Sequence, residues 1–268
     1  MFLLVLVAMV LVIRYGLQHG WPGAVTVNAW WTSHRDQVRA FVRRSPATFA
    51  YLAILTVTTW VLVGASSGVV DAMLREQSTN LSHLGRDPIR VLVRSAFWLS
   101  NYELLLWAVL YVVVLAPAER WLGTGRWLIA FAAGHVGATL LTATGVWLAI
   151  RSGTASHRLE DSVDVGVSYG FAAVAALFTY RLPGRWRWVW ATGLLSYVAA
   201  GILLDGSFTS FGHATAVLIG FALYPLTRST GVQERRAEPI LLPGARRPTE
   251  PVGQECVEHP SRYYPYGY

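Results

Sequence analysis

The chain has 268 residues, of which 54% are hydrophobic and only 14% are charged. An average soluble domain carries about 25% charged residues, and the mean hydropathy of this chain is +0.41. This composition excludes a disordered chain and argues against an ordinary soluble enzyme. The formal net charge of +7 permits either nucleic acid or anionic lipid as a partner, so the positions of the arginines must decide between them.

The N-terminal segment, residues 1–46, begins with an apolar run from Phe2 to Ile13. Twelve residues are too few to span a bilayer comfortably, and the run lacks the basic region that opens a signal peptide. Three interpretations stay open: an interfacial segment, a seventh span that continues past Arg14, or a mis-assigned start site. The first and the last are favoured, and the segment is expected to be cytoplasmic.

Residues 47–227 contain six long apolar stretches of about 17 to 24 residues each. At 1.5 Å per residue, such a helix matches a hydrocarbon core about 30 Å thick. The stretches lack the polar face that soluble helices show, so we predict an all-α membrane protein with a six-helix transmembrane bundle. The six stretches are Ala47–Val69, Phe97–Pro117, Trp127–Ile150, Val163–Tyr180, Trp188–Leu204 and Phe208–Leu226.

The arginines predict the orientation of this bundle. If the residues before Ala47 are cytoplasmic, 16 of the 22 basic residues, which are all arginine, fall on the inside and six on the outside. This bias predicts a plasma membrane protein with both termini in the cytoplasm. It also explains the positive charge by topology, so the lipid bilayer is an expected partner and nucleic acid is not.

The C-terminal segment, residues 228–268, is rich in Pro, Arg, Glu and Tyr and has no hydrophobic periodicity. We predict a disordered cytoplasmic tail, held near anionic lipid by its arginines. Cys256 is the only cysteine, which excludes an intramolecular disulfide and a cysteine-based zinc site.

Polar residues inside membrane segments are expensive to bury and are therefore the first candidates for function. Ser168 lies between glycines, in the sequence Gly166-Val167-Ser168-Tyr169-Gly170 of the fourth stretch. Flanking glycines permit close approach of a substrate or another backbone. They also suit a face for packing against a neighbouring helix, and this alternative stays open.

His213 lies near the start of the sixth stretch, followed by a small-residue face at Ala216 and Gly220. The predicted topology runs the fourth and sixth stretches in the same direction, so Ser168 and His213 each lie about five residues from the outer end. Residues at equal depth on two helices of one bundle are candidates for contact. A serine activated by a histidine base is the minimum for nucleophilic hydrolysis of a peptide bond.

The chain resembles the rhomboid family of intramembrane serine proteases. That family has a six-helix core, a Gly-x-Ser nucleophile in its fourth helix and a histidine base in its sixth, which correspond to Ser168 and His213. The segment Glu119–Arg126, Glu-Arg-Trp-Leu-Gly-Thr-Gly-Arg, looks like the family's turn between the second and third helices. Arg75–Leu81 and Pro88–Trp98 look closer to an actinobacterial rhomboid-like branch.

The resemblance implies cleavage of transmembrane helical proteins without a metal or a cofactor. The sequence departs from it where the family carries a His-x-x-x-Asn pair that helps to bind the oxyanion, since Glu103 and Trp107 occupy those places. An ionised glutamate there would repel a developing oxyanion, whereas a protonated one could donate a hydrogen bond. In addition, Tyr169 replaces a usual glycine, and the aromatic ring that often stacks on the histidine falls on Ala172.

Two further polar residues are possible supporting groups. Asp164 lies four residues before Ser168, on the same helix face, and could orient His213 as the third member of a triad does. A carboxylate in water at the edge of the membrane is the favoured alternative. His135 in the third stretch could donate a hydrogen bond at the site, although packing against another helix is favoured for it.

These residues and the resemblance are compatible with three functions. The first is a rhomboid-like intramembrane serine protease with a Ser168–His213 dyad. The second is a rhomboid pseudoprotease that binds membrane helices without cleaving them, motivated by the degenerate oxyanion motif. The third and least favoured is a small transporter with a proton relay through Glu103, His135 and His213, because the sequence contains no inverted repeat to support it.

Overall fold

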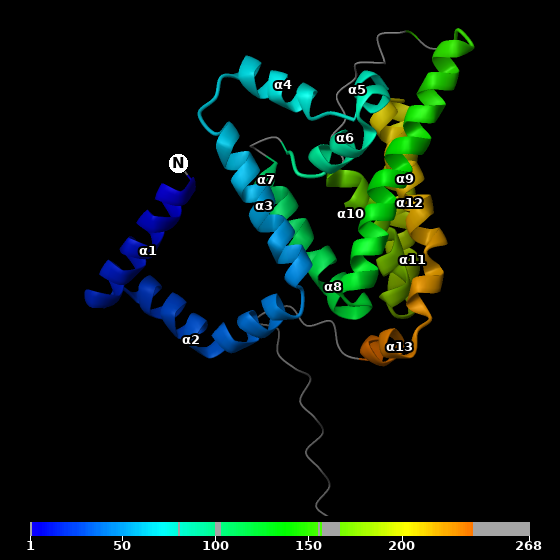
Figure 1. The fold of residues 1–268 in the computed structure, drawn as a ribbon. Helices are drawn as coiled ribbons and strands as arrows, with labels where there is room; N and C mark the ends of the chain where they lie inside the picture. The colour runs from blue at the N-terminus through cyan, green and yellow to red at the C-terminus, as the bar shows by residue number, and fades with distance from the viewer. Residues whose placement is uncertain (1, 80, 100–102, 155, 157–166, 238–268) are drawn as a thin grey trace, which may run out of the picture.

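Helices joined by short turns make up the part of the chain that this computed structural model describes, which comprises residues 2–79, 81–99, 103–154, 156 and 167–237 (Figure 1). The three N-terminal helices are α1 (Phe2–Gln18), α2 (Pro22–Arg43) and α3 (Pro46–Leu62). The next region contains α4 (Ser67–Glu76), α5 (Leu81–Arg86) and α6 (Pro88–Ser95). The rest are α7 (Leu104–Leu110), η1 (Tyr111–Leu115), α8 (Ala116–Leu122), α9 (Thr124–Arg151), α10 (Val167–Phe178), η3 (Thr179–Arg181), α11 (Gly184–Leu204), α12 (Phe208–Ala222), η4 (Tyr224–Thr227) and α13 (Thr230–Ala237).

Each of the six predicted apolar stretches contains one main helical segment. The second differs most from the expectation, because its helix begins at Leu104 instead of Phe97 and continues through a π-helical turn, η1, to Leu122. A π-turn inserts one extra residue and changes which side chains face the neighbouring helices. The predicted turn between the second and third stretches is confirmed at Gly123, whose φ of +83° lies in the region that favours glycine.

Within the described residues, three helical segments are long and apolar enough to cross a bilayer: Leu104–Leu122, Thr124–Arg151 and Gly184–Leu204. The pair α2 and α3 passes the same test jointly but bends by 93° at its break. The described helices α10 and α12 have 12 and 15 residues, fewer than a full span needs. The membrane-type helical bundle is therefore present, and the count of six spans stays a prediction.

The centre of the bundle is α10, which packs against both α9 and α12 (Figure 1). Its residues from Ala172 to Phe178 are all buried. Glycines make the close approach possible: a Cβ at Gly134 of α9 would overlap the Ala173 side chain, and one at Gly220 of α12 would overlap the Ala173 carbonyl oxygen. Small residues of this kind let membrane helices gain van der Waals contact over a long interface.

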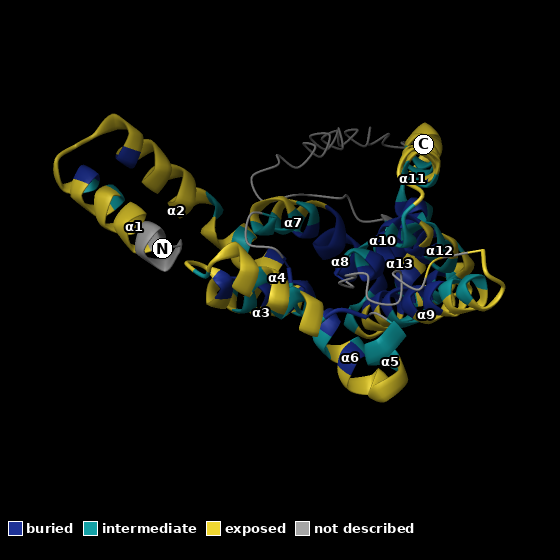
Figure 2. Ribbon diagram, turned by 90° about the horizontal axis from the view of Figure 1, so that it is seen from above, coloured by how far each residue is buried: buried dark blue, intermediate teal, exposed yellow. Residues whose placement is uncertain are grey.

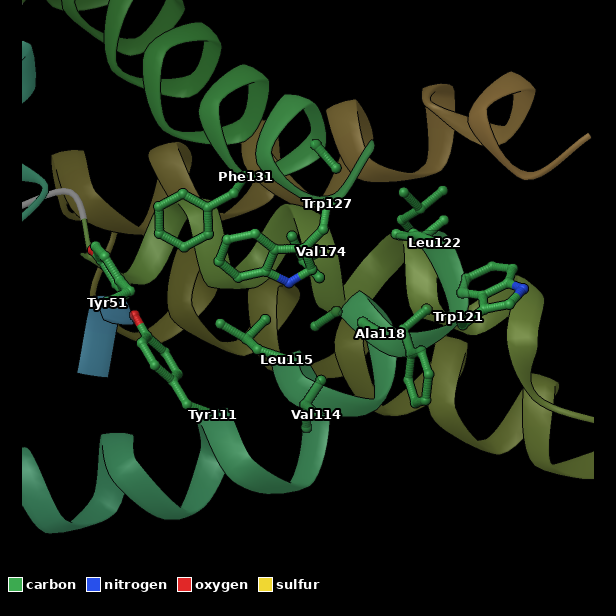
Figure 3. Close-up of a cluster of buried hydrophobic side chains, with 14 of the residues drawn as sticks. Tyr51, Tyr111, Val114, Leu115, Ala118, Trp121, Leu122, Trp127, Phe131 and Val174 are labelled. Atoms are coloured by element: carbon green, nitrogen blue, oxygen red, sulfur yellow. The ribbon is translucent and has the colours of Figure 1, made fainter. Parts of the chain in front are cut away.

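A cluster of aromatic and aliphatic side chains fills the space between α3, α8, α9 and α10 (Figure 3). Tyr51 of α3 stacks on Tyr111 at 5.6 Å between ring centroids and meets the edge of Phe131 of α9 at 5.0 Å. Trp127 and Phe131 stack on each other at 5.2 Å. Aromatic pairs in these geometries contribute beyond their buried area. Figure 2 shows the same concentration of buried residues around α8 and α10.

The buried carboxylate of Glu119 joins three helices. Its oxygens accept hydrogen bonds from the backbone amides of Ala47 and Thr48, at 2.9 and 2.8 Å, and from the Thr48 hydroxyl at 2.7 Å. The Thr124 hydroxyl donates a fourth bond at 2.8 Å. The carboxylate therefore caps the N-terminus of α3, where amides lack intrahelical partners, and also holds the start of α9.

Both terminal segments contain more helix than their composition indicates. The apolar run Phe2–Ile13 is part of the longer helix α1, which continues to Gln18. The prediction of a disordered tail does not hold for Thr230–Ala237, which form α13 because tertiary contacts stabilise this short polar helix. Arg235 donates hydrogen bonds to the carbonyls of Trp121 and Leu122 at 2.8 and 3.2 Å. Residues 238–268 lie outside the described part of the chain.

We predict that Gly220→Ala destabilises the protein, because the added methyl group would overlap the Ala173 carbonyl oxygen. Overpacking of this kind costs about 1–3 kcal/mol of unfolding free energy. The measurement is reversible unfolding in mild detergent, followed by circular dichroism. Gly145→Ala on α9 is the matched control, since an added Cβ there would meet no neighbouring helix or side chain within 4 Å and the helix gains propensity. Equal stability of the two variants would contradict the packing argument.

Candidate active site

Ser168 and His213 lie within hydrogen-bond distance of each other at one end of the bundle. Ser168 is the second residue of α10, and His213 is in the second turn of α12. The Ser168 Oγ and His213 Nε2 atoms are 2.9 Å apart, and both side chains are partly buried. This distance falls in the range expected for a nucleophile and its base. A nitrogen in this position can accept the serine proton when the imidazole is neutral and protonated on Nδ1.

Close packing between α10 and α12 sets this distance. Gly212 precedes His213 and faces Tyr169, which follows Ser168, so closely that a Cβ at Gly212 would overlap the tyrosine hydroxyl. Ala216 and Gly220 continue the contact along α12, and both are fully or largely buried. The glycine before the histidine therefore brings the two backbones together at the level of the dyad.

Two tyrosine rings surround the His213 imidazole. Tyr169, which is fully buried, meets it edge-on at 5.3 Å between ring centroids and an interplanar angle of 82°. Tyr197 of α11 lies at 6.0 Å and 54°. The expected place for a stacking ring, Ala172, holds no ring, and these two tyrosines instead restrict the movement of the imidazole.

A pocket of about 210 Å³ opens beside His213, between α11 and α12. Its walls are mainly apolar, from residues such as Val198 and Leu204, and its polar lining comes from Tyr197, Ser210 and His213. A pocket with apolar walls and a few convergent polar groups is typical of a site for a small group of a ligand. The His213 side chain is thus accessible from the α11 side.

The loop before α12 carries a short polar network that fixes the start of the helix. Ser207 caps α12 by accepting a hydrogen bond from the Ser210 amide, and the Ser210 hydroxyl donates to Asp205 Oδ2 at 3.1 Å. Hydrogen bonds from the Ser207 and Ser210 hydroxyls lower the pKa of Asp205, which is exposed. An ionised Asp205 and a capped helix hold the first turns of α12, and hence His213, in place.

A family model described as rhomboid-like protein matches residues 40–233 of the chain. The chain belongs to this family. No curated protein and no solved structure shows a significant match. The rhomboid-like protein is accordingly an all-helical, multi-pass membrane protein whose bundle is of rhomboid type, and membership supports either an intramembrane protease or a pseudoprotease.

His135 of the rhomboid-like protein contacts α6. Its Nε2 atom is 2.8 Å from the Leu92 carbonyl oxygen and 3.5 Å from the Ser95 hydroxyl, and the side chain is buried. These contacts tie α6 to α9. They favour the interpretation of His135 as a packing residue over its role as a donor beside Ser168.

Glu103 lies at the N-terminus of α7, and its carboxylate accepts a hydrogen bond from the Trp107 indole at 3.5 Å. Trp107 in turn packs edge-on against Phe171 of α10, at 5.5 Å between centroids. Phe171 is three residues beyond Ser168. Glu103 and Trp107, two of the departures from the family pattern, therefore contact each other, and Trp107 packs against α10, the helix that carries Ser168.

Two further predicted residues, Gly166 and Asp164, lie outside the described residues. Both interpretations of Asp164, the favoured carboxylate in water and the group that orients His213, stay predictions. Sequence reasoning did not identify Tyr197 or Ser210, because a tyrosine and a serine in or beside an apolar stretch carry no distinctive signal. Among the described residues, no three His, Cys, Asp or Glu side chains gather as a metal site would require.

We predict that Tyr169→Ala reduces the reactivity of the Ser168–His213 pair, because the imidazole loses the ring that it meets edge-on. An aromatic contact contributes about 0.5–1.5 kcal/mol, which corresponds to a loss of roughly two- to thirteenfold. The measurement is the second-order rate of labelling by a fluorophosphonate. Tyr169→Phe keeps the ring and should retain the wild-type rate, so a matching loss in this control would assign the effect to the hydroxyl.

Proposed function

We propose that this rhomboid-like protein is an intramembrane serine protease that uses a Ser168–His213 dyad. The single observation that carries the proposal is the 2.9 Å distance between Ser168 Oγ and His213 Nε2. Family membership supplies the class of function, and the residues supply a nucleophile and a base.

In the proposed reaction, Ser168 Oγ attacks the carbonyl carbon of the scissile peptide bond while His213 Nε2 takes the hydroxyl proton. The imidazolium then returns this proton to the leaving amine, and an acyl-enzyme remains on Ser168. Water attacks the acyl-enzyme with the same histidine as base and regenerates the serine. The amide of Ser168, in the first turn of α10 where helix amides lack intrahelical acceptors, is a candidate donor to the oxyanion.

The proposed substrates are transmembrane helical proteins, cut near the outer face of a bacterial plasma membrane. The arginine distribution supports an orientation with both termini in the cytoplasm. The membrane domain is residues 47–227, flanked by segments 1–46 and 228–268. The reaction of the dyad needs no metal or cofactor, since a histidine base activates the serine.

The pocket between α11 and α12 supports access of a substrate to the dyad. Gly201 and Ser210 both line this pocket and lie close together, because a Cβ added at Gly201 would be 3.1 Å from the serine hydroxyl. Apolar walls around a volume of about 210 Å³ accommodate a side chain of moderate size. This supports a preference for apolar residues near the cleavage site.

The second candidate function is a rhomboid pseudoprotease that binds membrane helices without cleaving them. The contact between Glu103 and Trp107 favours it, because a glutamate and a tryptophan replace the pair that the resemblance assigns to oxyanion binding. Loss of one oxyanion donor typically lowers the rate about 10²–10³-fold. The two functions differ in whether Ser168 reacts, and this can be measured directly.

We predict that a fluorophosphonate probe labels the wild-type protein and that Ser168→Ala abolishes the labelling. His213→Ala should lower the rate at least about a hundredfold, because a general base contributes about 10²–10⁴-fold. The measurement is the time course of labelling in detergent or liposomes, alongside cleavage of a reporter transmembrane helix.

Ser152→Ala is the matched control for this experiment, since Ser152 is an exposed serine beyond the end of α9. Its labelling should equal that of the wild type. Labelling that persists in Ser168→Ala would place the nucleophile elsewhere. A folded wild-type protein that neither reacts nor cleaves would favour the pseudoprotease.

We also predict that Glu103→Gln raises the cleavage rate if the protein is a protease. Removing a carboxylate charge from the region of the developing oxyanion should lower the barrier by about 1 kcal/mol, which is roughly fivefold. The measurement is the initial rate of reporter cleavage. Glu76→Gln, at the exposed end of α4, is the control and should leave the rate unchanged. A lower rate in Glu103→Gln would contradict an electrostatic penalty from this carboxylate.

A further inference from the structure

Helix α2 has two distinct faces although it precedes the first apolar stretch. Successive helical residues are 100° apart, so residues three or four apart share a face. One face carries Val27, Trp31, His34, Val38 and Phe41. A second face, about 120° around the helix from the first, carries Asn28, Thr32, Arg35, Arg39 and Arg43. This is the pattern of a helix that lies between an apolar and an aqueous environment.

The direction of α2 is close to perpendicular to that of α3. The two helices meet at a break after Arg43 with a bend of 93° (Figure 1). The helix α3 is uncharged and apolar, as a membrane-crossing helix is. If α3 follows the membrane normal, α2 lies in the plane of the membrane, at the level of the bundle end where α8 and α13 meet.

Contacts at both ends of α2 show which side its apolar face is on. Near the N-terminus, Ala24 packs against Gly16 of the apolar helix α1, where an added Cβ would lie 2.8 Å from the alanine. Near the C-terminus, Phe41 meets the edge of Phe49, in the first turn of α3, at 5.9 Å. The apolar face of α2 is therefore turned toward the side on which α3 crosses the membrane.

The middle of this face is exposed. Val27 and Trp31 on this face, and Trp30 at its edge, retain 46–48% of their accessible surface, and Figure 2 shows α1 and α2 largely exposed at the edge of the molecule. Adjacent tryptophans at such a position are typical of the membrane–water interface, where their amphipathic rings are stable. The polar face carries three arginines and one aspartate, Asp36, which pairs with Arg39 at 3.7 Å, so it is net positive.

We propose that α2 is an interfacial helix that inserts Val27, Trp31 and Val38 into the headgroup region of an anionic leaflet. Arg35, Arg39 and Arg43 then lie among the lipid phosphates. A helix with Trp on one face and Arg on the other binds anionic membranes in this orientation. The inference depends on membrane insertion of the bundle and not on protease activity.

Adjacent residues on the apolar and polar faces of α2 provide a matched test in the full-length protein. Four single-cysteine variants are made in a Cys256→Ser background: Val27→Cys, Trp31→Cys, Asn28→Cys and Thr32→Cys. Each carries an NBD fluorophore and is reconstituted into vesicles of phosphatidylcholine and phosphatidylglycerol. Quenching is measured with doxyl-labelled lipid, which acts from the bilayer, and with iodide, which acts from water.

The proposal predicts that doxyl-lipid quenches the labels at positions 27 and 31 at least twofold more than those at 28 and 32, with the reverse order for iodide. Equal iodide quenching at all four positions would overturn it. Labels at 27 and 31 that neither quencher reaches would also overturn it, because another protein surface would then cover this face.

A separate comparison tests whether the negative charge of the lipid contributes to insertion of α2. In vesicles of phosphatidylcholine alone, or for an Arg35→Gln/Arg39→Gln variant with the label at position 27, doxyl quenching should fall. Each arginine near an anionic surface changes partitioning about fivefold, so the ratio of inserted to water-exposed label should decrease at least that much. Identical quenching in both lipids would overturn the role of lipid charge.

Discussion

The close approach of α10 to α9 and α12 is the constraint on which the rest of the bundle depends. In a bilayer, lipid tails are as apolar as leucine, so helices associate through van der Waals contact and hydrogen bonds. Gly134 and Gly220 leave room for the Ala173 side chain and carbonyl from opposite sides. This packing runs the length of α10, and at its end it leaves Ser168 and His213 2.9 Å apart.

Glu119, His135 and the Ser168–His213 pair differ in how fully the protein surrounds them. Glu119 is almost completely buried, and four donors satisfy its carboxylate, so it acts as a fixed joint between α3, α8 and α9. His135 is likewise buried and bound to α6. Ser168 and His213 are only partly buried, and a pocket reaches the histidine. A polar pair that is open to a pocket can react, whereas a satisfied one stabilises.

The side chains around the proposed dyad therefore differ in kind from those around the proposed oxyanion region. Tyr169 and Tyr197 hold the imidazole from two helices, which keeps the base in register with the serine. On the α7 side, Trp107 fills the space against Phe171 and binds the Glu103 carboxylate. The protein thus combines a close Ser168–His213 contact with a Glu103–Trp107 pair at the places that the resemblance assigns to oxyanion binding, and the first feature favours a protease whereas the second favours a pseudoprotease.

The sequence by itself determined the helical membrane class, the family, the Gly123 turn and the pairing of Ser168 with His213, because these depend on local patterns and equal depth in the membrane. It indicated Glu103 and Trp107 as departures but not that they bind each other. Only the tertiary structure decided the partner of His135, the rings around His213, the helical state of Thr230–Ala237 and the direction of α2. Those features are contacts between residues distant in the chain, and helical periodicity specifies which face is apolar but not what that face meets.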